Sequence, residues 1–202
     1  MTTAALPAAH RPRAGAFLAV WAVGVLALGA LLVLRHEMRL PKSDDGPEAF
    51  RSAVEDTRSP AEKGEFLAIH VLASGCGCSA RVLDRLLARR PAPGVSERIV
   101  WVGDGPLPSA ANAEARGYHV ETLTRDAARV RYHAESAPVL GVVTPGAALA
   151  YLGGYVDRSR SPSPVPEDLV ARLAAGERFR SLPTFGCAIG KSLAARTNPL
   201  GL

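Results

Sequence analysis

Residues 69–78 read Ile-His-Val-Leu-Ala-Ser-Gly-Cys-Gly-Cys, and in this stretch an apolar run ends at two thiols, Cys76 and Cys78. The amphipathic residues 79–90 follow directly, which predicts a strand that turns into a helix at the cysteines. The N-terminus of a helix has a partial positive charge and free N–H groups, and both lower the pKa of a nearby thiol. The pair is therefore the first candidate for redox chemistry. The alternative is a pair of buried, inert core residues, against which the glycines around the pair argue.

The helix expected after the thiols has a single apolar stripe. It consists of Val82, Leu83, Leu86 and Leu87. Because these positions recur at helical spacing, we interpret the stripe as core and not as a cofactor-binding surface. Packing of the stripe would hold the helix N-terminus, with both cysteines, at the edge of a sheet.

Outward from this junction, strands alternate with helices. The expected strands cover residues 66–73, 98–102, 118–123, 138–143 and 148–155, and the expected helices cover residues 79–89, 109–116, 125–133 and 167–175. Such alternation predicts an α/β fold with a central mixed sheet flanked by helices. The last two strands form an antiparallel hairpin around the turn Thr-Pro-Gly at residues 144–146.

Residues 14–34 form a run of 21 residues without a charged side chain, long enough as a helix to cross a hydrocarbon core of about 30 Å. We predict a retained N-terminal transmembrane anchor. A cleavable signal peptide is the alternative, but its apolar core normally has only about 7 to 15 residues. Arg11 and Arg13 precede the run and Arg35 and Arg39 follow it, so these charges do not set the orientation.

This anchor divides the chain into five expected segments. They are a cytoplasmic N-terminus (1–13), the anchor (14–34), a tether (35–64) with a possible short helix at 47–56, a folded domain (65–178) and a C-terminal extension (179–202). Paired thiols suit an oxidising compartment. We therefore expect a single-pass protein of the inner (cytoplasmic) membrane whose C-terminal domain is periplasmic or extracytoplasmic.

The charge of the chain gives little support to nucleic-acid binding. Its 24 basic and 19 acidic residues leave a net charge of +5. Residues 1–40 carry four arginines and one acid, so more than half of this excess lies beside the predicted membrane segment. Aromatic residues make up only 5% of the chain, and no basic stripe is interleaved with them.

A strand that ends in paired thiols, the helix that follows, and a later proline before a hairpin strand together resemble the thioredoxin superfamily. The match covers residues 66–175. It is closest to the membrane-tethered periplasmic thiol-disulfide oxidoreductases, such as the thioredoxin-like cytochrome c maturation proteins. Residues 132–138, Tyr-His-Ala-Glu-Ser-Ala-Pro, look like their Tyr-Gly-Val-x-x-x-Pro, and residues 144–146 look like part of their Asp-x-x-Gly turn.

The resemblance implies a role for each matching residue. Cys76 corresponds to the exposed attacking cysteine and Cys78 to its partner. Pro138 corresponds to the cis-proline that faces the thiols and presents the backbone of Ala137 to an incoming peptide. The substrate-binding residues implied in this way are Gly75, Gly77, Ala137 and Pro138.

Two residues depart from the family pattern. The family motif is Cys-x-x-Cys, whereas only Gly77 separates the two cysteines here. A disulfide between them would be strained and therefore easier to reduce, which predicts an oxidising or isomerising redox couple. His70 takes the place of the buried acid that moves protons for the resolving thiol. A histidine can move protons near neutral pH, so His70 is a candidate catalytic residue, with a hydrogen-bonded core histidine as the alternative.

Cys187 lies in Gly-Cys-Ala-Ile at residues 186–189, outside the common thioredoxin core, and some redoxin-like proteins have a similar late Gly-Cys-x-Ile. A third cysteine in an oxidising compartment needs an explanation. It is a possible resolving thiol for Cys76 or Cys78. A buried thiol and the third ligand of a metal site are the alternatives.

These features predict an enzyme, a membrane-anchored thiol-disulfide oxidoreductase that needs no cofactor and no metal. Its partners would be a protein thiol or disulfide and a redox partner. The alternative is a tethered copper-binding or copper-delivery protein that uses Cys76, Cys78 and either His133 or Cys187, because thiolates suit Cu(I). A peroxidase is less favoured, because Ile69 and Ala73 occupy the Pro and Thr positions of the peroxiredoxin motif. A non-catalytic scaffold is also less favoured, because it does not explain the cysteine pair.

Overall fold

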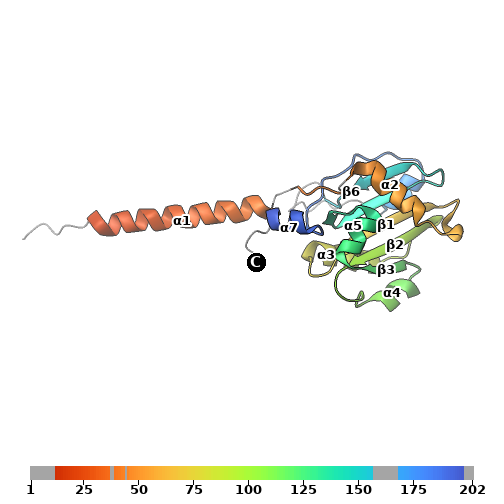
Figure 1. Ribbon diagram of the computed structural model, residues 1–202, viewed down its shortest axis with the longest axis horizontal. Coiled ribbons are helices and arrows are strands. Elements are labelled where there is room, and N and C mark those ends of the chain that lie inside the picture. Colours follow the sequence, from red (N-terminus) through yellow and green to blue (C-terminus); the bar gives the residue numbers. More distant parts are fainter. Residues whose placement is uncertain (1–11, 37–38, 44, 157–167, 198–202) are drawn as a thin grey trace, which may run out of the picture. The chain divides into compact units, whose positions relative to one another are not determined.

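The computed structural model describes residues 12–36, 39–43, 45–156 and 168–197 (Figure 1). The chain divides into two compact units, Met1–Glu37 and Met38–Leu202, and each is described by itself.

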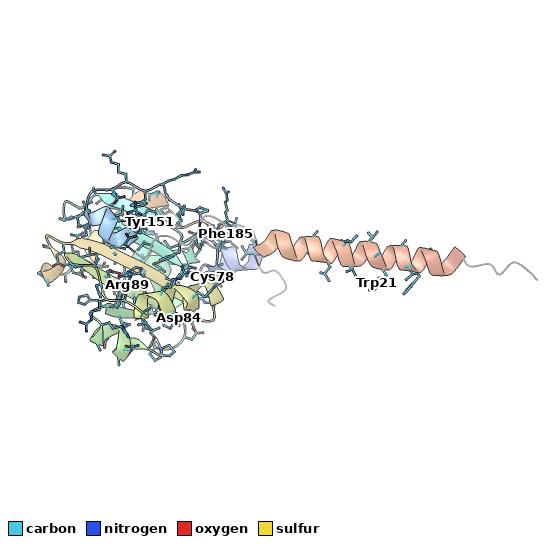
Figure 2. All side chains as sticks on the ribbon, turned by 180° about the vertical axis from the view of Figure 1, so that it is seen from behind. Trp21, Cys78, Asp84, Arg89, Tyr151 and Phe185 are labelled. Carbon is cyan, nitrogen blue, oxygen red and sulfur yellow. The ribbon has the colours of Figure 1, made fainter. Side chains whose placement is uncertain are left out.

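The described part of the first unit is one helix, α1 (Pro12–His36). It contains the apolar run at residues 14–34, and large side chains such as Phe17, Trp21 and Leu26 are exposed on it (Figure 2). Over the residues that the structure describes, no helix meets both the length and the hydropathy needed to cross a membrane. The transmembrane anchor stays a prediction.

The second unit is built on a five-stranded mixed sheet with the strand order β3-β2-β1-β5-β6 (Figure 1). Its strands are β1 (Phe66–Ala73), β2 (Val95–Val102), β3 (His119–Leu123), β5 (Val139–Val143) and β6 (Leu149–Gly153). The first three run parallel, and β5 and β6 form the antiparallel hairpin beside β1. All residues of β1 except Phe66 are buried, as expected of a central strand covered on both faces.

Helices cover both faces of this sheet. They are α2 (Gly46–Asp56), α3 (Gly77–Leu87), α4 (Ala110–Ala115), α5 (Arg125–Tyr132) and α6 (Leu169–Ala174). On one face Ile69 and Val71 of β1 pack with residues of α2 and α5. On the other face Leu72 packs with Val82, Leu83 and Leu86, so three residues of the predicted α3 stripe are core. The predicted α/β class is confirmed, and the layers are compatible with a thioredoxin-like fold.

The remaining short elements come from the ends of this unit and from the proline region. They are a 3-10 turn (Pro60–Glu62), β4 (Ser136–Ala137), β7 (Cys187–Ala188) and α7 (Lys191–Thr197). The strand expected at residues 138–143 begins instead at Val139, and the short strand β4 ends just before Pro138. The peptide bond between Ala137 and Pro138 is cis, as the resemblance implied. The final helix expected at residues 167–175 is shorter, and residue 167 lies outside the described part of the chain.

The compact unit includes residues that the sequence assigned to the tether. Phe50 and Val54 of α2 are fully buried against β1, because their spacing of four places both on one helix face. The unit therefore begins at Met38 and not at residue 65. The C-terminal extension also packs on this unit, since β7 pairs with β4.

Candidate thiol site

Cys76 lies at the junction of β1 and α3, where it is the N-cap of the helix in an extended conformation. The turn before it needs Gly75, whose φ of +71° is unfavourable for other residues. The Ala73 N–H donates to Oγ of Ser79 at 3.0 Å, which joins the end of the strand to the first turn of the helix. The helix begins at Gly77, two residues earlier than predicted, so Cys78 lies in its first turn.

Cys76 faces the proline region as predicted. Its Sγ lies 3.8 Å from the carbonyl oxygen of Ala137, the residue before the cis-proline. The expectation that Cys76 is exposed is wrong, because only 3% of it is accessible to solvent. It belongs to the buried core cluster on the α2 and α5 face of the sheet.

Cys187 approaches the same point from the C-terminal extension. In the antiparallel pair of β7 and β4, Cys187 lies directly opposite Ala137. Cys187 and Cys78 are both half-buried and pack against the core cluster that contains Cys76. All three cysteines are free thiols, and two of them, Cys76 and Cys187, lie against Ala137.

Among the three thiols, Cys76 is the one that ionises most readily. Hydrogen bonds from the thiols of Cys187 and Cys78, followed by bonds from Ser79, hold the pKa of Cys76 well below its usual range, although burial opposes this. The pKa of Cys187 and that of Cys78 are raised, because each thiol keeps its proton to donate to Cys76 and is itself partly buried. The structure thus favours one thiolate supported by two thiols.

Cys78 is the more accessible member of the predicted pair. An exposed arginine, Arg81, reaches it from the next turn, with Nη2 3.5 Å from the Cys78 sulfur. This cation opposes the rise in the Cys78 pKa. Figure 2 shows Cys78 and Phe185, a neighbour of Cys187 in sequence, toward the same end of the second unit.

His70 has both ring nitrogens occupied. Its Nδ1 lies 2.7 Å from the hydroxyl of Tyr155 and its Nε2 lies 2.9 Å from the carboxylate of Glu97. It is 1% exposed and belongs to a buried polar network. These contacts match the hydrogen-bonded core histidine that was the alternative, and the catalytic role of His70 stays a prediction.

Glu97 is the centre of that network. Its buried carboxylate also accepts two hydrogen bonds from Arg89, at 2.8 and 2.7 Å, and one from the N–H of Ala92. Burial alone would raise the pKa of Glu97, but the bonds from His70 and Arg89 lower it to about 2. Sequence reasoning missed Glu97 and Arg89, since nothing local marks an acid on a strand as buried.

Within the part of the chain that the structure describes, no three His, Cys, Asp or Glu side chains are arranged to hold a metal ion. His133, a candidate copper ligand, has its Nδ1 2.8 Å from Asp45.

Comparison with known proteins identifies no family. No protein-family model and no curated protein matches the chain. An uncharacterized conserved protein from Geobacillus kaustophilus is similar to it in structure with 19% identity and a TM-score of 0.44, over 63% of this chain and 78% of that one. A hypothetical protein from Sinorhizobium meliloti 1021 has 17% identity and a TM-score of 0.42, over 76% and 90% of the two chains.

Proposed function

We propose that this protein is a thiol-disulfide oxidoreductase whose nucleophile is Cys76. The observation that carries the proposal is the position of Cys76, which lies at the N-terminus of α3 and against Ala137 and interacts with two other free thiols, Cys78 and Cys187. A thiolate is the attacking species in disulfide exchange, and the lowered pKa of Cys76 keeps its sulfur ionised near neutral pH.

The chemistry consists of two exchange steps. The Cys76 thiolate attacks one sulfur of a substrate disulfide, which forms a mixed disulfide and releases the other substrate sulfur as a thiolate. A second thiol of the cluster then attacks Cys76 and releases the remaining substrate sulfur. The substrate disulfide gains two electrons, and the enzyme dithiol becomes a disulfide. Cys78 and Cys187 both interact with Cys76 and are the candidates for the second step.

Reduction of a protein disulfide by the full-length chain, with a dithiol as electron source, tests the proposal. We expect turnover in the wild-type protein and only background turnover in Cys76→Ser, because the attacking sulfur is gone. Comparison with Cys78→Ser and Cys187→Ser shows whether the loss is specific to Cys76.

The rate of exchange should also persist as the pH falls below the usual thiol pKa of about 8.5, since the folded protein favours the Cys76 thiolate. Turnover that survives in Cys76→Ser would contradict the proposal. Tight Cu(I) binding without disulfide exchange would favour the copper alternative instead.

A further inference from the structure

The segment at residues 184–190, here called the strap, crosses the thiol site as an extended chain. The Leu40 N–H donates to the carbonyl of Thr184 at 2.9 Å, and the Ile189 N–H donates to the carbonyl of Glu135 at 2.8 Å. Between these two attachments β7 pairs with β4, and Cys187 lies opposite Ala137. The strap thus holds a cysteine against the backbone beside Pro138.

Two glycines let the strap lie this close. A β-carbon on Gly186 would collide with the carbonyl oxygen of Ala137 and would lie 2.7 Å from Cδ of Pro138. A β-carbon on Gly190 would lie 2.8 Å from Oε1 of Glu135. Real β-carbons do not approach other atoms so closely. The surface of β4 and Pro138 is therefore matched to an extended chain with glycine just before its cysteine.

Residues of the strap are buried in or against the core cluster that contains Cys76. Phe185 is 7% exposed and Ile189 is 1% exposed, and Ile189 belongs to the same core cluster as Cys76. Cys187 packs against this cluster from the outside. Because Cys76 is almost fully buried, an external disulfide can reach it only when the chain around it moves.

We propose that the strap is a resident mimic of the substrate, and that Cys187 is the thiol which resolves the mixed disulfide on Cys76. This inference rests on the proposed function. The pairing of β7 with β4 uses backbone groups, so a second extended chain can occupy the same place when the strap lifts. The substrate class is an extended polypeptide segment with a cysteine preceded by a small residue.

The electrons balance in two steps. With the strap lifted, the Cys76 thiolate attacks a substrate disulfide, forms a mixed disulfide and releases one substrate thiolate. When the strap returns, the Cys187 thiolate attacks the Cys76 sulfur, so that the Cys76–Cys187 bond forms as the second substrate thiolate leaves. Because Cys76 reacts as a thiolate, the reduced pair holds one proton, that of Cys187. This proton passes to one released substrate sulfur by way of solvent, and the other substrate sulfur leaves as a thiolate.

The test uses the reduced full-length chain and, as probe, the disulfide-linked dimer of a peptide with the sequence Thr-Phe-Gly-Cys-Ala-Ile. Mass mapping follows the disulfides formed. The variant Gly186→Ala adds one methyl group that collides with Ala137, and Gly105→Ala is the matched control, because its β-carbon would meet no atom within 4 Å. Crowding a tight contact destabilises it, so the strap of Gly186→Ala should lift more often.

We expect the wild-type protein to end with a Cys76–Cys187 disulfide. Cys187→Ser should stop at the mixed disulfide between Cys76 and the peptide. Gly186→Ala should form this mixed disulfide about tenfold faster than Gly105→Ala, a factor equal to about 1.4 kcal/mol.

A wild-type product that joins Cys76 to Cys78 and leaves Cys187 free would overturn the inference and leave the proposed function standing. Equal rates for Gly186→Ala and Gly105→Ala would also overturn it. If Cys76 fails to react in every variant, including Gly186→Ala, the proposed function fails with the inference.

Discussion

Single residues decide the chemistry of this protein through their partners, and Cys76 illustrates this. The thiol is almost fully buried, which by itself would raise its pKa, yet hydrogen bonds from two other thiols and from Ser79 lower it. The pair of cysteines was visible in the sequence. The third cysteine became part of the same site only through the pairing of β7 with β4.

Glu97 is a second residue whose role depends on its partners. Its carboxylate is fully buried and bonded to His70, Arg89 and Ala92. We expect Glu97→Gln to lower the free energy of unfolding by roughly 1.5–3 kcal/mol, because the half-buried Arg89 and the buried His70 lose the charged acceptor that they face. Urea unfolding monitored by circular dichroism measures the change.

The effect of Glu97→Gln should depend on pH. The pKa of Glu97 is about 2 in the folded protein, below its ordinary value of 4.5. The contribution of Glu97 to the free energy of unfolding is therefore fully present above pH 4.5, and it disappears as the pH falls through about 2. The difference in the free energy of unfolding between the wild-type protein and Glu97→Gln should decrease as the pH falls over that range. The exposed Glu114→Gln serves as the control, with a change below about 0.5 kcal/mol, and an equal loss in both variants would refute the assignment.

At the scale of elements, the helix α2 packs closely on strand β5 of the sheet. A β-carbon on Gly141 of β5 would lie 2.6 Å from Cζ of the fully buried Phe50. The glycine therefore makes room for an aromatic ring of α2. This close contact explains why residues of the expected tether belong to the core.

We expect Gly141→Ala to reduce the free energy of unfolding by about 1–3 kcal/mol through overpacking. Phe50→Leu in the same chain should restore part of that loss, because it removes the ring that the new methyl group meets. Urea unfolding of the two single variants and the double variant measures the coupling. Strictly additive effects would show that the two residues do not compete for this space.

At the scale of the whole molecule, the sequence predicts an anchored protein whose second unit lies outside the cytoplasm. This prediction depends on the apolar run at residues 14–34 and on the preference of paired thiols for an oxidising compartment. A C-terminal fusion to alkaline phosphatase tests it. We expect an active fusion, because alkaline phosphatase needs an oxidising compartment to form its disulfides. An inactive but intact fusion would place the C-terminus in the cytoplasm.

Features that depend on neighbouring residues followed from the amino-acid sequence alone. The apolar run before Cys76 and the stripe after it predicted β1 and α3, because strand and helix periodicities are local properties of a chain. The turn at residues 144–146 predicted the hairpin of β5 and β6 in the same way. The resemblance to the thioredoxin superfamily added the cis bond before Pro138.

Which of these elements meet is seen only in the folded chain. Cys76 and Ala137 are 61 residues apart in the chain, and Cys187 lies still farther along it. The packing of Cys76 in its core cluster and the hydrogen bond between His70 and Glu97 likewise arise from segments that are distant in sequence. Contacts of this kind form because the folded chain buries apolar surface and pairs its buried polar groups, and no local pattern specifies their partners.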